Sequence, residues 1–159
     1  MSKADATADD DDVATLEAAA IRLLASREHS RAELERKLAY RFGASALVGN
    51  LLDDLQAREL LSEQRFVENY IDQRHRKGFG PQRIRVELAG RGLSAEQIES
   101  GFDALAIDWE SALARVAEQK FGVSPAGDRG SLAKRGRFLE QRGFPVGLIR
   151  RYLDRTVNA

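Results

Sequence analysis

One apolar skeleton recurs three times along this chain of 159 residues, and this recurrence limits most strongly how the chain can fold. Leu38, Leu88 and Leu139 align at spacings of 50 and 51 residues. The residues ten and fourteen positions after each of these leucines are again apolar: Val48, Leu52, Ile98, Phe102, Ile149 and Leu153. Diverged repeats of this length are typical of helical modules that stack on their neighbours and present a long surface. We therefore expect a tandem array, an architecture more typical of a binding protein than of an enzyme.

Each copy carries a candidate helix start eight residues before its aligned leucine. These positions hold Ser30, Gly80 and Ser131. Gly80 is followed by Pro81, and proline is favoured at the first helical position because no amide hydrogen is needed there. Gly92 is expected to end the helix that Pro81 begins.

Capping signals mark further helix starts. Ser30 to Glu33 and Ser94 to Gln97 match capping boxes, in which the hydroxyl and the acidic or amide side chain each accept from a backbone amide that helix geometry leaves unpaired. Ser62 can cap another helix. Apolar residues recur at helical spacing throughout, and no long alternating stretch indicates a strand. The sequence therefore predicts an all-α fold.

The helix pattern divides the chain into a tail and three modules. Residues 1–12 carry five aspartates and one lysine with few apolar side chains, a composition that predicts a disordered acidic tail. The three-helix repeats are then expected at residues 13–61, 62–107 and 108–157. Because the whole chain has a net charge of zero and the tail has −4, the remainder carries +4.

Composition excludes several classes of protein. The chain has no cysteine, so disulfides, thiol nucleophiles and cysteine-based zinc sites are excluded. No apolar run approaches the ~20 residues that a membrane-spanning helix needs. The N-terminus lacks the basic and apolar regions of a secretory signal, so we expect a cytoplasmic protein.

Charge is strongly segregated along the repeats. Residues 74–91 hold six basic residues and one acidic residue, and residues 129–151 hold seven and one, whereas residues 94–118 hold one basic residue and six acidic residues. Such runs are often only a solvated surface. Their placement in two repeats also fits a basic stripe that faces an anionic or mixed-charge partner. The candidate partner-binding residues are Arg74, Arg76, Lys77, Arg83, Arg85, Arg91, Arg135, Arg137 and Arg142.

No arrangement of residues predicts catalysis. His29 and His75 are the only histidines and fall in different repeats, so they do not suggest a metal site or an acid–base pair, and His75 is expected at the surface. Asp53 and Asp54 are adjacent on a helix and diverge by about 100°. There is no glycine-rich phosphate loop. We therefore expect neither an enzyme nor a bound cofactor or metal.

Several motifs of the sequence resemble those of the RecX family of regulatory proteins. The most specific stretch runs from Arg65-Phe66-Val67 through Tyr70 and Arg74 to Gly80-Pro81 and the helix that contains Ile84, Glu87 and Leu88. Residues 30–38 resemble the signature of the family's first repeat, and residues 53–62 its acidic linker. Gln64 departs from the family, where an acidic residue commonly precedes Arg-Phe.

The resemblance implies both a fold and a function. The fold is three tandem three-helix repeats in an elongated, curved array. The function is to bind the RecA recombinase filament on DNA and to modulate, mostly inhibit, its ATPase, strand-exchange and coprotease activities in DNA repair and the SOS response. A monomer is expected, and a weak direct contact with DNA is compatible with this role.

The main alternative is a helical protein that acts directly on single-stranded DNA. Arg76, Lys77, Arg83 and Arg85 lie around an expected helix N-terminus, a place that favours phosphate oxygens. Few aromatic side chains are expected to be available for base stacking, because the spacing of Phe66 and Tyr70 favours core packing.

Overall fold

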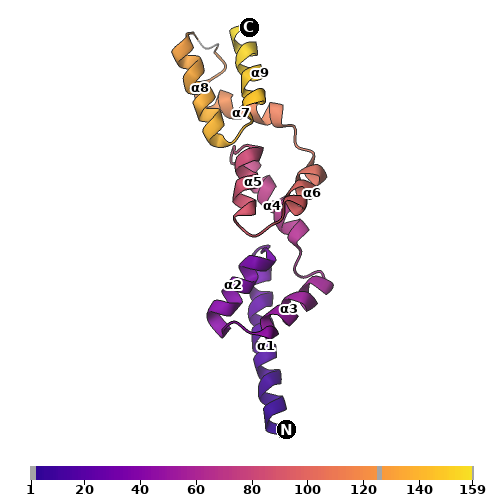
Figure 1. The fold of residues 1–159 in the computed structure, drawn as a ribbon. Helices are drawn as coiled ribbons and strands as arrows, with labels where there is room; N and C mark the ends of the chain where they lie inside the picture. The colour runs from indigo at the N-terminus through magenta and orange to yellow at the C-terminus, as the bar shows by residue number, and fades with distance from the viewer. Residues whose placement is uncertain (1–2, 125–126, 159) are drawn as a thin grey trace. The chain divides into compact units, whose positions relative to one another are not determined.

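A computed structural model describes residues 3–124 and 127–158, and within these ranges the chain forms nine α-helices and no strand (Figure 1). The all-α prediction is confirmed. The helices are α1 (Lys3–Ser26), α2 (Arg31–Phe42), α3 (Ala46–Ala57), α4 (Glu63–Arg76), α5 (Pro81–Ala89), α6 (Ala95–Leu105), α7 (Trp109–Phe121), α8 (Arg129–Arg142) and α9 (Val146–Val157). None of them, over the described residues, combines the length and the apolarity needed to cross a membrane.

The aligned residues occupy equivalent places in three helical triplets. Leu38, Leu88 and Leu139 are fully buried in the second helix of each triplet. Val48, Ile98 and Ile149 are buried in the third helix. A glycine with positive φ follows each second helix, at Gly43, Gly92 and Gly143. The three-helix repeat predicted from spacing is therefore present in the fold.

The described chain forms two compact units. The first comprises the residues up to Val67 together with the short segment Arg91–Leu93, and the second comprises Glu68–Gly90 and the residues from Ser94 onward. The first unit buries one face each of α1, α2 and α3, including Leu16, Leu34, Leu38, Leu52 and Leu55. Helices α7, α8 and α9 of the second unit share a core that includes Leu113, Ala117, Leu139, Phe144 and Ile149. Because this division does not follow the repeats, domain boundaries at 13–61, 62–107 and 108–157 stay a prediction.

Most predicted helix starts are confirmed. Ser94 and Gln97 form a complete capping box, and the Ser62 hydroxyl accepts from the Arg65 amide at 3.2 Å. Gly80 precedes α5 in extended conformation, with Pro81 at the first helical position.

Three details of the helix ends differ from the prediction. Asp128, not Ser131, begins α8, because its carboxylate accepts from the Ser131 amide at 2.6 Å. Helix α5 ends at Gly90 rather than at Gly92. At the start of α2, Ser30 accepts from the Glu33 amide at 3.1 Å, but the Glu33 carboxylate binds two arginines instead of completing a capping box.

The acidic segment also differs from the expectation of a disordered tail. Helix α1 begins at Lys3, so the described residues up to Asp12 are helical, while Met1 and Ser2 lie outside the described range. Alanine has the highest helix propensity, and aspartate is favoured near the positive end of the helix dipole. Among the α1 residues whose side chains the structure describes, Leu16 is the first that is buried.

In the second unit, the start of α5 lies directly against the end of α8. The Gly80 amide donates to the Arg142 carbonyl at 2.7 Å, and the Gln82 amide donates to the Gly143 carbonyl at 3.0 Å. A Cβ on Gly80 would lie only 2.5 Å from the Gly143 carbonyl oxygen, and a Cβ on Gly143 only 2.6 Å from the Arg83 amide nitrogen. Two glycines are therefore needed for the backbones to approach this closely.

We expect Gly80→Ala to destabilise the protein by about 1–3 kcal/mol or more, because the added methyl group meets rigid backbone atoms. The backbone of Gly80 itself (φ −87°, ψ 167°) is open to any residue, so the cost would report the close approach alone. Gly90→Ala, at the other end of α5, is the matched control. Its Cβ would make only ordinary contacts at 3.5 Å, so stability should be unchanged or slightly higher. Urea unfolding of the two variants measures the difference, and equal stabilities would contradict this packing.

Candidate partner-binding surface

The Glu87 carboxylate on α5 accepts hydrogen bonds from several of the polar side chains around it. Nε and Nη2 of Arg74 donate to its carboxylate, at 2.8 and 2.6 Å, and the Tyr70 hydroxyl donates to it at 2.7 Å. Arg83, one turn before it, donates at 3.1 Å. Arg74 is only 20% exposed in its side chain. Arg74, one of the predicted partner-binding residues, is therefore mainly a structural cation.

Three arginines also surround one aromatic ring. The guanidinium carbons of Arg74, Arg83 and Arg142 lie 3.8, 4.5 and 4.8 Å from the centre of the Phe79 ring. Arg142 donates to the Lys77 carbonyl at 3.3 Å. Cations over a ring face are attracted by its quadrupole, and each such contact contributes about 0.5–2 kcal/mol. The Phe79 cluster thus holds the α4–α5 turn against the end of α8.

The environment of Glu87 favours its charged form. Partial burial raises the pKa of its carboxyl group, but hydrogen bonds from Arg74, Tyr70 and Arg83 outweigh this effect. The net result is a pKa below the ordinary value of 4.5. Glu87 is therefore ionised at neutral pH and balances part of the positive charge around it.

The remaining cations of this stretch are more open to solvent. Arg76 is 76% exposed and pairs with Asp72 one turn earlier at 2.9 Å. The Lys77 side chain is exposed and has no hydrogen-bond or ion-pair partner among the described residues. Arg85 is 40% exposed, pairs with Glu99 at 2.6 Å and lies over the Phe102 ring at 4.3 Å. These side chains can meet a partner without loss of the core.

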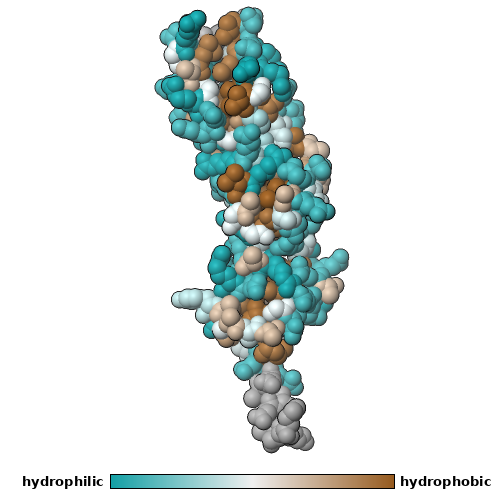
Figure 2. All heavy atoms as spheres, viewed as in Figure 1, coloured by the Kyte–Doolittle hydropathy of each residue, from teal (hydrophilic) through white to brown (hydrophobic). Residues whose placement is uncertain are grey.

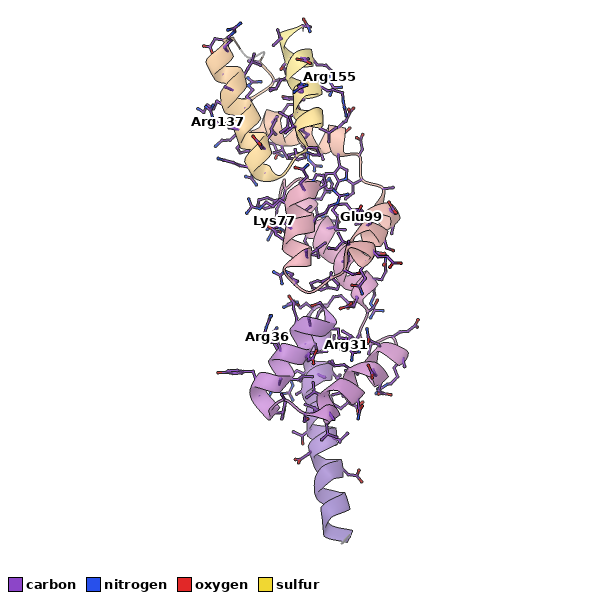
Figure 3. The ribbon with its side chains drawn as sticks, viewed as in Figure 1. Arg31, Arg36, Lys77, Glu99, Arg137 and Arg155 are labelled. Atoms are coloured by element: carbon purple, nitrogen blue, oxygen red, sulfur yellow. The ribbon has the colours of Figure 1, made fainter. Side chains whose placement is uncertain are left out.

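The basic residues of α8 divide in the same way. Arg135 is only 5% exposed, which contradicts its assignment to a partner-binding surface. It donates to the Ser124 carbonyl at 2.9 Å, and its guanidinium lies 5.4 Å from the centre of the Phe121 ring. Arg137 is exposed and makes no ion pair within the described chain. In Figure 3, Arg137 and Lys77 lie on the same edge of the second unit, while Glu99 lies on the opposite side.

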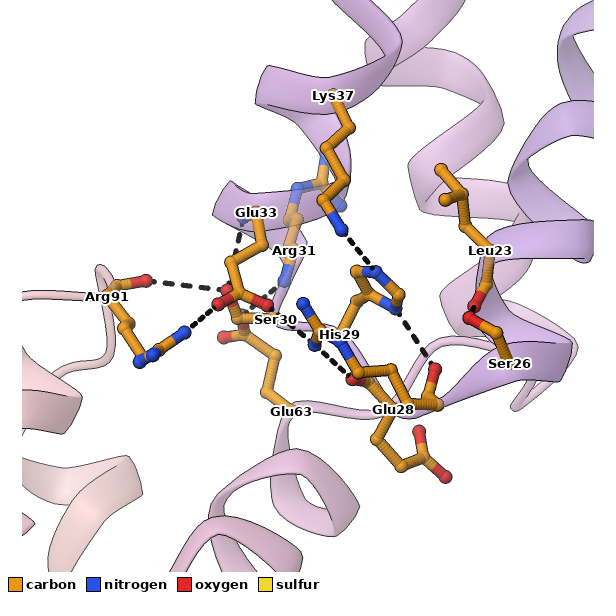
Figure 4. Close-up of polar contacts among 11 residues, drawn as sticks. Leu23, Ser26, Glu28, His29, Ser30, Arg31, Glu33, Lys37, Glu63 and Arg91 are labelled. Carbon is orange, nitrogen blue, oxygen red and sulfur yellow. Dashed lines mark hydrogen bonds and ion pairs between the residues drawn. The ribbon is translucent and has the colours of Figure 1, made fainter.

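Arg91 belongs to a network in the first unit that Figure 4 shows in detail. It pairs with Glu33, which is buried with only 4% of its side chain exposed and also binds Arg27 at 3.2 Å. Burial raises the pKa of Glu33, but hydrogen bonds from the two arginines lower it further, to below 4.5. The Ser30 hydroxyl donates to the Arg91 carbonyl at 3.4 Å.

Sequence reasoning missed this buried carboxylate. Glu33 stands at the third position of a helix, where an acidic side chain ordinarily caps the helix start. Its partner Arg91 is 58 residues away in the chain, and local spacing carries no signal for such a pair.

The two histidines have separate structural roles. His29 is buried, with Nδ1 3.0 Å from the Arg27 carbonyl and Nε2 3.0 Å from Lys37 Nζ. His75 is half-buried rather than a surface residue, because its ring packs edge-on against Trp109 at 5.4 Å. Trp109 also contacts Phe102, with 5.9 Å between the ring centres. The described residues contain no group of three side chains suited to hold a metal ion.

The helix N-terminus considered for phosphate binding is closed. Pro81 has no amide hydrogen, and the amides of Gly80 and Gln82 already donate to carbonyls at the end of α8. An anion would have to displace these two hydrogen bonds. The N-terminus of α5 therefore gives no support to direct binding of a nucleic acid.

Comparison with known proteins identifies the family. A family model described as RecX, second three-helix domain, matches residues 62–101. The regulatory protein RecX of Pseudomonas savastanoi pv. phaseolicola is 42% identical over 135 residues, which are 85% of this chain and 87% of the relative. The chain belongs to the RecX family.

Solved structures of RecX proteins share the fold. RecX from Lactobacillus salivarius matches with a TM-score of 0.76 at 20% identity, over 91% of this chain and 97% of the other. A second crystal structure of a regulatory protein RecX matches with a TM-score of 0.77 at 17% identity, over 97% of this chain and 80% of the other. The matched relatives are named as regulatory proteins, and the triplets of helices are a property of the RecX fold.

We expect Glu87→Gln to lower the free energy of unfolding by about 1–3 kcal/mol at pH 7, because hydrogen bonds to a charged acceptor are lost or weakened. A carboxyl group with a lowered pKa in the folded state contributes stability that is present above its ordinary pKa and is lost as pH falls through the folded value. The difference in unfolding free energy between wild type and variant should therefore shrink below about pH 4.5.

Glu118→Gln serves as the matched control, because Glu118 is an exposed carboxylate of the same unit without an ion pair in the described chain. Chemical unfolding at pH 7 and at pH 3.5 measures both differences. A Glu87→Gln difference that stays constant with pH would refute the role given to this carboxylate.

Proposed function

We propose that this protein binds the RecA recombinase filament on DNA and restrains its ATPase, strand-exchange and coprotease activities. The observation that carries the proposal is the 42% identity to a regulatory protein RecX over most of both chains. The motif residues of the resemblance also build the scaffold of the second unit, since Arg74 binds Glu87 and Gly80 caps α5.

The partner-binding surface is assigned to exposed cations of the second unit. It consists of Arg76, Lys77, Arg83 and Arg137, whereas Arg85 is held beside Glu99. Arg74 and Arg142 position this surface through the Phe79 cluster, and Arg91 is held by Glu33 in the first unit. Exposed charges act mainly on the rate of association and on the salt dependence of binding. An anionic surface of the filament is therefore the complementary partner.

The role is regulatory rather than catalytic. We assign no substrate, metal or cofactor, and the protein acts as a cytoplasmic monomer that reaches its partner by diffusion. Contact with the DNA of the filament is secondary, because the N-terminus of α5 is closed to phosphate.

We expect the double variant Arg76→Glu with Lys77→Glu to inhibit the recombinase ATPase about tenfold less effectively than wild type. Each exposed ion pair is worth up to about 1 kcal/mol, and charge reversal removes two of them. Both side chains are exposed and outside the Phe79 cluster, so circular dichroism should be unchanged. ATPase assays on single-stranded DNA, repeated with added salt, measure the effect.

The double variant Arg22→Glu with Arg41→Glu changes the net charge equally but lies in the first unit, so it controls for overall charge. Wild-type inhibition by the Arg76/Lys77 variant would place the interface elsewhere. Equal weakening by both double variants would indicate a general charge effect. Salt-dependent binding to bare single-stranded DNA, with none to the filament, would favour the alternative of a DNA-binding protein.

A further inference from the structure

An apolar groove lies open between α8 and α9 in the last repeat. Its volume is about 490 Å³. Its floor and walls include Leu132, Gly136, Val146, Ile149, Leu153 and Val157. Figure 2 shows hydrophobic surface over these two helices. Val146 and Val157 are more than half exposed, so no part of the described chain covers this surface.

The equivalent face of the second repeat is covered. With the spacing of 51 residues that relates Leu88 to Leu139, Arg85 corresponds to Gly136 and Phe102 to Leu153. Arg85 lies 4.3 Å from the centre of the Phe102 ring and pairs with Glu99 on α6. In the last repeat a glycine takes the place of this covering arginine.

Nothing in the packing of α8 requires that glycine. Gly136 lies inside the helix, where glycine costs about 0.5–1 kcal/mol relative to alanine. A Cβ at this position would meet only Leu153 Cδ1, at an ordinary contact distance of 3.6 Å. The glycine therefore weakens the helix and leaves the apolar floor of the groove accessible.

The two helices that form the groove carry a net positive charge. Helices α8 and α9 together carry eight basic and two acidic residues, a net charge of +6. Arg137 and Arg150 stand on the rim, and neither has an ion-pair partner within the described residues. Glu140 and Asp154 also stand on the rim and are the two acidic residues of these helices. A partner that fills the groove thus meets an apolar floor, two cations without ion pairs in the described chain, and two carboxylates, on helices whose total charge is positive.

We propose that this groove binds an acidic amphipathic helix of the partner protein. Apolar side chains at helical spacing would fill the groove, as in other helix-in-groove complexes, and carboxylates on the flanks would pair with Arg137 and Arg150. The choice of an acidic segment rests on the charge of α8 and α9. Its assignment to the protein of the recombinase filament rests on the proposed function.

The test introduces into the last repeat the arginine–glutamate pair that covers the equivalent face of the second repeat. Gly136→Arg with Arg150→Glu recreates the pair that Arg85 and Glu99 form. Removal of a helix-interior glycine should leave thermal stability equal or higher. Gly147→Arg with Arg129→Glu has the same net charge change on the same two helices but does not line the groove, so it is the matched control.

Two readouts separate the groove from the partner. The fluorescent probe anilinonaphthalene sulfonate combines an apolar ring system with an anionic sulfonate. Wild type and the control should therefore enhance its emission. In the covered variant, Gly136→Arg with Arg150→Glu, this enhancement should be at least fivefold smaller. Affinity for recombinase assembled on single-stranded DNA should fall at least tenfold in the covered variant and stay within twofold in the control.

The outcomes are distinct. No probe binding by wild type would mean that the groove is not open, and unchanged filament affinity of the covered variant would mean that the groove is not the docking site. A wild-type dimer that the covered variant dissociates would identify a second copy as the occupant, and a loss of affinity for bare DNA would identify a nucleic acid. Each of these results overturns the proposal. Failure of wild type to bind the filament at all would instead refute the proposed function.

Discussion

The close contact between the start of α5 and the end of α8 determines how the second unit presents its charges. Gly80 and Gly143 allow the start of α5 to donate two backbone hydrogen bonds to the end of α8 without intervening side chains. This contact brings Arg83 and Arg142 to the Phe79 ring, where Arg74 already binds Glu87. Three guanidinium groups can share this site because one ionised carboxylate balances part of their charge. The basic stretch is therefore partly a structural device and only partly a surface for a partner.

The sequence predicted helices and their core positions well because these depend on local spacing. Residues within one or two turns are enough to predict three of these features. They are the buried Leu38, Leu88 and Leu139, the Ser94 capping box and the helix start at Gly80-Pro81. Which charged side chains are exposed and which are buried was harder to predict. Arg135 and Arg137 are two residues apart in the same basic run, yet one is buried beside Phe121 and the other is exposed.

Long-range pairing explains most of what the sequence could not show. Glu33 matched a capping residue in its local context, but it binds Arg91 from a distant part of the chain. His75 stands within a basic run, but it packs against Trp109 of the next helix triplet. Similarly, the repeats share a scaffold while differing at the positions that cover it, as Arg85 and Gly136 do. An alignment of the repeats pairs these positions, but only the structure shows which of the paired side chains covers apolar surface.

In the proposed complex, the exposed cations of the second unit, and not its acidic side, face the recombinase filament. Electron cryo-microscopy of this protein bound to recombinase on single-stranded DNA tests it directly. We expect Lys77 and Arg137 to lie within about 4 Å of carboxylates of the filament protein. A complex in which Glu99 and helix α6 face the filament, while Lys77 and Arg137 point into solvent, would contradict it.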